Sequence, residues 1–508
     1  MDYDLLKNSI SLKEYTLDTV SEQPVDVDIT LPDYCPDIEK ILKCTLVPKI
    51  YTKNISGGQL SVDGAATIRI IYVDSNSKLR SFEYSTPFSA SYSLKSTPEQ
   101  YIVLIDTKSE YVNCRALSPR KLVIHGAFSL YSKVVTKKPV DFYSAPEDTD
   151  LQTRGEKVSL SSLCCLCEEQ FTVSEDITVN DKPPVESIIS SMLQSKITEC
   201  KSIHNKIMLS TELKLHIMYL SDLQSGEIEH LSYVFPISRI IDCEGVEEDT
   251  VLEPSLSVMS YDIHVRNDAV NDGSLLNLDA KINFSALGYT TKDMDIITDA
   301  YSTDYNVDVT RSPVSAISDF SVKDFSCVEK SVVSLDNETI SEVLDVYSDS
   351  LNISPAVSNG DLKILSKANI CILAKNTDDA PFYIERNIDF ENIFENINHD
   401  RIEDISGCIE SISYRILDDN NIEVRLEINF KCVLSNSIKI SPLTKISRLD
   451  DSKIEKDDRA LILYYADKGE NVWDISKAFS AKPDDLIAEN SLDGDTIESK
   501  MMLLIPTA

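Results

Sequence analysis

The sequence predicts a mainly β protein with some α-helix: three homologous β-rich domains in tandem, followed by a small βααβ module. The first observation is strand chemistry: residues 65–73 and 122–130 are rich in β-branched and aromatic side chains, and Gly, Asn, Ser and Asp bound such stretches. The second is that these stretches recur about every 150 residues. The third is a change of character after residue 458, where helical spacing begins.

Length, composition and charge limit the classes of protein that the chain can be. It has 508 residues and 42% hydrophobic content, which suits about three to four packed domains and is too much for a disordered chain. Its 84 acidic residues against 49 Lys and Arg give a formal net charge of −35. This acid excess argues against nucleic acid and anionic membranes as partners, because both bind through clustered basic side chains.

The chain is expected to open with a helix or an extended arm over residues 1–22. Apolar residues at Leu5, Leu6, Ile10 and Leu17 suit either element. The segment lacks the basic and apolar regions of a signal peptide, and no apolar run in the chain approaches the roughly 18 residues that span a bilayer. We therefore expect neither a secretion signal nor membrane insertion.

Two sets of strand-like stretches carry a threefold repetition. In the first set, residues 214–222 parallel residues 67–74, and residues 367–374 occupy the same place a third time. The second set consists of residues 122–130, 276–284 and 422–430. Copies of this length should fold independently, like beads on a chain. We place the three repeat domains at residues 23–138, 168–310 and 322–446.

A helical element is predicted ahead of the first strand of each domain, and polar stretches are predicted to separate the domains. The helix-like stretches are residues 33–42, in which Pro36 could open a helix, residues 184–193 and residues 337–344. The predicted linkers are residues 137–157, residues 309–324 and the charged stretch 447–458.

The last module, residues 459–508, has a pattern of its own. Its predicted strands are residues 460–465 and 501–505, and a helix is expected over residues 472–479. Pro483 suits the first position of a second helix. The predicted order is therefore β-α-α-β.

This module resembles a LysM domain, the small glycan-binding module of cell-wall proteins. The residues that match the family's pattern are Tyr465, Gly469, Glu470, Asn471, Val472, Trp473, Ile475, Ala478, Leu486, Asn490, Leu492, Ile497, Leu503, Ile505 and Pro506. In that family, chains that contain N-acetylglucosamine lie in a groove between two loops. The resemblance implies a groove with Gly469, Glu470, Asn471 and Val472 on one side and Leu492, Asp493 and Ile497 on the other.

The module departs from the LysM pattern at two turns and in its charge. Lys500 stands in place of a glycine before the last strand, and a lysine takes a positive φ only at a cost. Lys482 replaces the usual Ser or Thr cap of the second helix and is a poor N-cap. Residues 461–508 carry 4 Lys against 9 acidic residues, which would mildly repel an anionic wall polymer. A LysM fold that binds protein in place of glycan is the alternative.

Residues 25–42, which read V-D-V-D-I-T-L-P-D-Y-C-P-D-I-E-K-I-L, resemble the opening of a repeat found in spore coat morphogenesis proteins. Three such repeats and a C-terminal LysM module are the architecture of the SipL-like proteins. This resemblance implies a non-enzymatic role, in which the protein docks through its LysM module onto the coat morphogenetic ATPase that polymerises around the forespore. It also implies a location in the mother-cell cytoplasm, at the forespore surface and spore coat.

The sequence offers little support for catalysis or metal binding. Residues 164–167 contain a CxxC, but a zinc site usually needs two such pairs, so we interpret the segment as a cysteine-rich strand or loop edge. The 12 scattered cysteines suggest unpaired thiols in a reducing compartment. The six histidines form no HxH or HExxH pattern, and His125 and His216 read as ordinary strand residues. Phosphate-loop and nucleophile-elbow motifs are absent from the sequence. We expect no enzyme activity, no metal and no cofactor.

Two other functions stay open, and the distribution of charge along the chain indicates which part would contact a partner. One is a peptidoglycan-bound protein that acts through the LysM groove, and the other is a hydrolase with an unrecognised catalytic domain. Residues 1–150 hold 17 basic and 20 acidic residues, a net of −3, whereas residues 151–460 carry −27. The near-neutral first repeat is therefore the better candidate for a packed contact, and the acidic pair for solvent or a basic partner.

Overall fold

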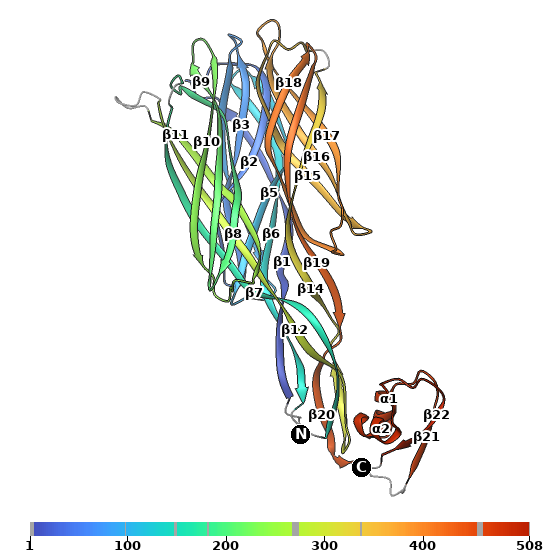
Figure 1. The fold of residues 1–508 in the computed structure, drawn as a ribbon. Coiled ribbons are helices and arrows are strands. Elements are labelled where there is room, and N and C mark those ends of the chain that lie inside the picture. The colour runs from blue at the N-terminus through green and yellow to red at the C-terminus, as the bar shows by residue number, and fades with distance from the viewer. Residues whose placement is uncertain are drawn as a thin grey trace.

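The computed structural model describes residues 5–96, 98–146, 150–179, 182–266, 274–335, 338–454 and 461–506. These residues are almost all strand, with 22 strands and two short helices. Figure 1 shows a broad body of long strands that narrows downward into a thin end, beside which the C-terminal module lies. The mainly β class with some helix is confirmed. Neither helix in the described part of the chain has the length and apolarity to span a membrane.

The same arrangement of six strands occurs three times. In each set the first, sixth and fifth strands pair antiparallel in one layer, and the second, third and fourth pair in another. The first of these layers is a separate sheet in unit 1, whereas those of units 2 and 3 are joined through their first strands into one six-stranded sheet. Unit 1 consists of β1 (Leu5–Thr30), β2 (Ile38–Ser56), β3 (Gln59–Asp74), β4 (Leu79–Ser93), β5 (Tyr101–Ser118) and β6 (Lys121–Pro146). Unit 2 consists of β7 (Leu151–Thr178), β8 (Ser187–Ile203), β9 (Lys206–Asp222), β10 (Glu227–Asp242), β11 (Val251–Arg266) and β12 (Leu275–Ser302). Unit 3 consists of β14 (Val314–Ser334), β15 (Glu342–Ser358), β16 (Asp361–Lys375), β17 (Pro381–Phe394), β18 (Arg401–Asp418) and β19 (Asn421–Ile440).

Each unit packs its two layers around a hydrophobic core of its own. In unit 2, Leu215, Ile217 and Tyr219 of β9 pack with Ile282 and Phe284 of β12. Units 1 and 3 have corresponding cores that centre on β3 and β16. Tyr72 of β3 and Tyr219 of β9 are equivalent in one further detail, since their hydroxyls donate to the carbonyls of Pro36 and Pro183.

The three units also share cores with one another. One shared core takes residues from all three units: Ile71 and Leu79 of unit 1, Ile189, Met218 and Leu220 of unit 2, and Leu344 and Leu373 of unit 3. Two more shared cores lie between the long strands. Successive side chains of a strand point to opposite faces, so Ile217 and Tyr219 fill the core of unit 2 while Met218 and Leu220 fill the shared one. The three units are therefore packed on one another and are not separated like beads, whereas their independent folding stays a prediction.

The helices predicted ahead of each repeat do not form in the described residues. Residues 5–30 form β1, which pairs antiparallel with β6 from Leu5–Pro146 to Thr30–Lys121, so the predicted opening helix is wrong and the extended alternative holds. β2, β8 and β15 begin within the helix-like stretches 33–42, 184–193 and 337–344, and the described residues ahead of them are turns or irregular; residue 337 lies outside the described residues. Hydrogen bonding to β3, β9 and β16 outweighs the local helical spacing in these segments.

The polar stretches predicted as linkers also lie largely in strands. Residues 137–157 belong to the ends of β6 and β7, apart from residues 147–149, which lie outside the described residues. The stretch 309–324 contributes to β13 (Tyr305–Arg311) and β14, and the stretch 447–458 to β20 (Leu443–Lys453), which pairs with β13, while residues 455–458 are not described. We call the narrow end formed by β13, β20 and the ends of β7 and β12 the stalk. Its small core consists of Leu151, Ile297, Ala300, Leu443 and Ile446.

Candidate functional site

The C-terminal module has the predicted β-α-α-β order. It consists of β21 (Ile462–Ala466), α1 (Val472–Ala478), α2 (Pro483–Asn490) and β22 (Met501–Ile505), and β21 pairs antiparallel with β22. The module encloses a core of its own, formed by Ala466, Val472, Ile475, Ala481, Leu486, Ile497, Leu503 and Ile505. Two helices and a two-stranded sheet therefore provide a compact frame for the loops between them.

Local hydrogen bonds explain where the two helices begin and end. The side chain of Asn471 accepts from the Trp473 amide at 2.8 Å and caps α1. Lys482 offers no such bond to α2, as expected of a poor cap, and Pro483 sets the first turn instead. The Asn490 amide group donates to the carbonyls of Leu486 and Leu504 and so ties the end of α2 to β22.

The turn before β22 does without the glycine that the LysM pattern has there. Lys500 does not adopt a positive φ, and its ammonium lies 2.9 Å from the Asp467 carboxylate. The position that needs glycine is Gly469, whose φ is 91°. Lys500 thus links the start of β22 to the end of β21 through this ion pair, and its backbone needs no left-handed conformation.

The two loops expected to form a groove are joined by backbone hydrogen bonds. The Gly469 amide donates to the Ile497 carbonyl at 2.8 Å, and the Ile497 amide donates to the Glu470 carbonyl at 2.9 Å. Asn471 forms a β-bridge with Thr496. The structure therefore brings Gly469, Glu470, Asn471 and Val472 beside Ile497, and these loops have little backbone freedom.

Only part of the predicted groove set is open to a ligand. Val472 and Ile497 are core residues with 1% and 2% exposure, whereas Gly469 and Asp493 are exposed. Glu470, Asn471 and Leu492 are half-buried. The side chain of Asn471 is engaged in the α1 cap, and a Glu470 carboxylate oxygen accepts from the Tyr464 hydroxyl at 3.2 Å. Binding of a glycan or of a protein partner by this set stays a prediction.

The helical side of the module is seated on the stalk. Trp473, the single tryptophan of the chain, donates from Nε1 to the Asp299 carboxylate at 2.8 Å, and its ring meets that of Tyr301 edge-on at 4.9 Å. The Tyr301 hydroxyl donates to the Ala481 carbonyl at 2.7 Å. Sequence reasoning missed this contact, since residues 299 and 473 lie far apart in the chain and neither carries a motif.

Asp299 is the electrostatic centre of this junction. It receives the Lys477 ammonium at 2.8 Å and the Arg311 guanidinium at 2.6 Å in addition to the indole N–H. Burial pushes the pKa of the Asp299 carboxyl upward, but the hydrogen bonds from Lys477 and Trp473 and the charges of Lys477 and Arg311 hold it below its ordinary value. The carboxylate therefore holds α1 against the stalk in its charged form.

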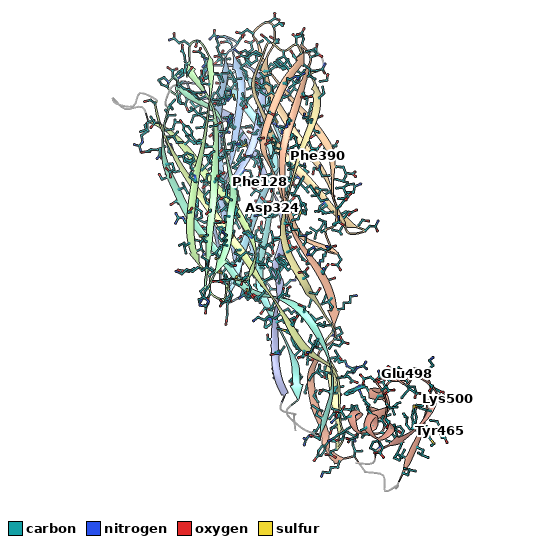
Figure 2. The ribbon with its side chains drawn as sticks, in the orientation of Figure 1. Phe128, Asp324, Phe390, Tyr465, Glu498 and Lys500 are labelled. Atoms are coloured by element: carbon teal, nitrogen blue, oxygen red, sulfur yellow. The ribbon has the colours of Figure 1, made fainter. Side chains whose placement is uncertain are left out.

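The opposite side of the module presents apolar side chains to solvent. Leu463 pairs with Leu504 and Tyr465 pairs with Met502 across the β21–β22 sheet. Tyr465 is 69% exposed, Leu463 and Met502 are exposed by about half, and Leu461 precedes them, also exposed. Figure 2 places Tyr465 on the side of the module away from the stalk. We call Leu461, Leu463, Tyr465, Met502 and Leu504 the outer sheet face.

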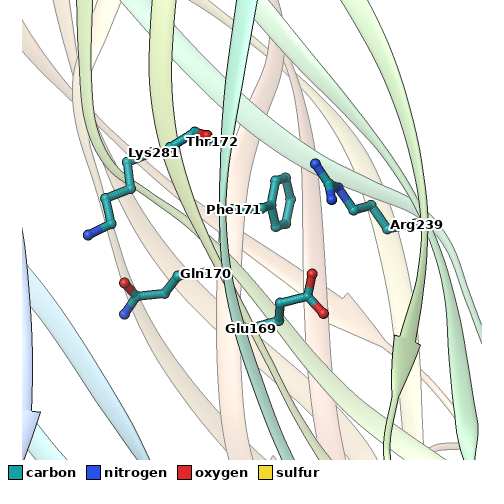
Figure 3. Close-up of a pocket in the computed structure, with 6 residues that line it drawn as sticks. All are labelled: Glu169, Gln170, Phe171, Thr172, Arg239 and Lys281. Carbon is teal, nitrogen blue, oxygen red and sulfur yellow. The ribbon is translucent and has the colours of Figure 1, made fainter.

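A shallow hollow in unit 2 has no catalytic arrangement. It measures about 330 Å³ and is lined by Glu169, Gln170, Phe171, Thr172, Arg239 and Lys281 (Figure 3). The Arg239 guanidinium lies over the Phe171 ring at 4.6 Å, and the Lys281 ammonium donates to the Tyr51 carbonyl at 2.7 Å. None of these six residues forms a nucleophile–base pair.

The CxxC segment lies in a strand, as interpreted from the sequence. Cys164, Cys165 and Cys167 belong to β7, and Cys165 and Cys167 are buried. All 12 cysteines are free thiols in the structure. Cys243 lies close to Cys165 and Cys167, which the sequence did not indicate.

Comparison with known proteins bears on units 1 and 2. The family model described as SipL, SPOCS domain, matches residues 37–117 and 184–266. These segments correspond to β2–β5 of unit 1 and β8–β11 of unit 2, so the same part of each unit is matched. A search of curated proteins finds no match. The two matches make these parts of the chain similar to the SipL, SPOCS domain family and support a sporulation-related context.

Proposed function

We propose that this chain is a non-enzymatic scaffold protein of spore coat assembly, which docks onto the coat morphogenetic ATPase through the outer sheet face of its LysM-like module. The similarity of units 1 and 2 to the SPOCS domain supports the sporulation role. The observation that carries the docking proposal is the exposed apolar face of β21 and β22, at the far end of an elongated molecule. A contiguous exposed apolar patch on a protein surface commonly marks an interaction site.

The geometry of the module favours this face over its helical side. Trp473 is buried against Tyr301, so α1 is not available without separating the module from the stalk. The outer sheet face carries Tyr465 between aliphatic neighbours, and aromatic anchors of this kind supply much of the binding energy at interfaces. The three fused units then act as a rigid spacer that holds the module away from the body.

Replacing the two central side chains of the outer sheet face tests the docking proposal. We expect the full-length Leu463→Ser/Tyr465→Ser variant to bind the purified ATPase at least about 10-fold more weakly, because removing a buried aromatic anchor typically costs about 2 kcal/mol or more. Tyr414→Ser is the matched control, since Tyr414 is an exposed tyrosine of β18 in unit 3. Biolayer interferometry with immobilised ATPase gives the affinities.

Variants of the loop residues distinguish docking from glycan binding. Co-sedimentation with purified peptidoglycan that depends on Gly469, Asn471 and Asp493 would favour a glycan-binding function through the loops. Equal ATPase affinity of the double variant and the unchanged protein would contradict docking through the outer sheet face. A fluorescent fusion followed during sporulation checks the proposed location in the mother cell, at the forespore surface.

A further inference from the structure

The three units meet pairwise at three joints, which are formed by the second, third and fourth strands of neighbouring units. At the joint of units 1 and 2, the Arg69 guanidinium of β3 pairs with Glu83 and donates to the Ser191 carbonyl of β8 at 3.0 Å. At the joint of units 3 and 1, the Lys43 ammonium of β2 pairs with Glu385 and lies 3.2 Å from Asp349. At each of these two joints, a permanent cation of the chain contacts the second strand of the neighbouring unit.

At the joint of units 2 and 3, Lys196 and Lys214 of unit 2 reach Glu410 of β18, but the position equivalent to Arg69 holds a histidine. His216 of β9 stands three residues before Tyr219, as Arg69 stands three residues before Tyr72, so the two side chains occupy equivalent places. His216 faces Asp345 of β15, with 3.7 Å between its Nε2 and the carboxylate, and stacks on His230 of β10 with the ring centroids 5.5 Å apart. Two imidazoles and a carboxylate thus converge where the other joints have a positive charge.

We propose that His216, His230 and Asp345 bind a divalent transition-metal ion of the zinc type, which ties unit 2 to unit 3. One ligand atom from each residue lies within 4.8 Å of the other two. Tetrahedral zinc with bonds of about 2.0–2.2 Å holds its ligands about 3.3–3.6 Å apart, so binding requires these atoms to approach one another by no more than about 1.5 Å. Two imidazoles, one carboxylate and a water molecule are a ligand set that zinc takes in proteins.

The hydrogen bond to His216 and the partial burial of the three residues favour a metal site. The Nδ1 of His216 is held by the Ser232 hydroxyl at 3.0 Å, which leaves Nε2 turned toward Asp345. The Asp345 and His216 side chains are 10% and 32% exposed, so the site is sheltered but open to a small ion. The nearby Lys182 ammonium does not fill the place, since it donates to the His230 carbonyl at 2.6 Å and pairs with Glu229.

A second cluster of possible metal ligands lies at the joint of units 3 and 1, where a lysine already pairs with its carboxylates. Asp349, Cys371 and Glu385 also bring ligand atoms within 4.8 Å of one another, and no further cluster of this kind occurs in the described parts of the chain. There the Lys43 ammonium already neutralises the carboxylates. We therefore assign a metal only to the histidine joint.

Metal titration of the full-length protein tests this assignment. We expect one Zn²⁺ per chain by isothermal calorimetry, and a Tm that rises with added Zn²⁺ because the ion binds only the folded joint. His230→Ala should weaken binding by about 100-fold or more, since it removes one of three protein ligands. His204→Ala is the matched control: His204 is exposed, lies at the β8–β9 turn, and forms side-chain hydrogen bonds with Glu247 and Asn205.

Co²⁺ distinguishes this site from the 12 free thiols. Coordination by two imidazoles and a carboxylate gives visible d–d bands without a thiolate-to-cobalt charge-transfer band in the near ultraviolet. If His230→Ala proves misfolded by circular dichroism, Asp345→Asn takes its place, with the same loss of affinity expected. Absence of Zn²⁺ binding, a cobalt spectrum dominated by thiolate charge transfer, or equal binding by the folded ligand variant would overturn the proposal.

Discussion

Leu220→Ala is expected to destabilise all three units together, by about 2–5 kcal/mol. Leu220 is fully buried in the core that units 1, 2 and 3 share, although its strand belongs to unit 2. Its truncation leaves a cavity lined by side chains of all three units, and close-packed interiors relax only partly around such a cavity. Hydrogen exchange measured by mass spectrometry should therefore speed up in β3, β9 and β16 alike.

Glu212→Ala is the control for this experiment. Glu212 lies on the same strand, its side chain is exposed, and such a substitution usually changes the free energy of unfolding by no more than about 0.5 kcal/mol. Faster exchange confined to unit 2 in Leu220→Ala would contradict a shared fold and restore the picture of independent domains.

Asp299→Ala is expected to release the C-terminal module from the stalk. The substitution leaves the Trp473 N–H, Lys477 and Arg311 without their common acceptor, and hydrogen bonds to charged groups contribute about 1.5–3 kcal/mol each. Trp473 is the single tryptophan, so its emission reports on this junction alone. We expect a red shift as the indole becomes exposed to water, and a larger radius of gyration by X-ray scattering.

Acid should weaken the same junction without any mutation. The pKa of Asp299 is held below its ordinary value, so its contribution is complete above the ordinary aspartate pKa of about 3.9 and is lost as the pH falls through the lower pKa of the docked state. A titration of Trp473 emission follows this loss.

For both experiments Asp295→Asn is the control, because Asp295 is an exposed aspartate of the same strand. Unchanged emission in Asp299→Ala would show that other contacts hold the module.

The strand content and the order of the last module could be predicted because both depend on local patterns. Residues 25–31 alternate strictly between apolar and polar side chains, which is a strand signal. Helical spacing in residues 184–193 misled, because β8 is defined by its pairing with β9 and not by its own propensity. The domain boundaries predicted from polar stretches were wrong in the stalk, because its long strands enclose only a small core and are therefore largely polar.

The packing of the three units on one another is indicated in the sequence by uninterrupted apolar runs, which differ from the alternating pattern of a strand buried on one face. Residues 217–220 are apolar without interruption, as are residues 70–73, and such runs are typical of strands buried on both faces. By contrast, the contact between Asp299 and Trp473 and the joint of His216 with Asp345 depend on how whole units are placed. No spacing along the chain encodes them. In the predicted groove, the burial of Val472 and Ile497 follows from their place in the core of the module.

Hydrogen exchange of the complex with the ATPase tests the central claim most directly. The account predicts that binding protects the β21 and β22 peptides, which carry Leu463, Tyr465 and Met502, while α1 and the end of β12 keep the exchange rates of the free protein. Protection of the Trp473 peptide with unchanged exchange in β21 and β22 would contradict it, because the module would then have left the stalk and docked through its helical side.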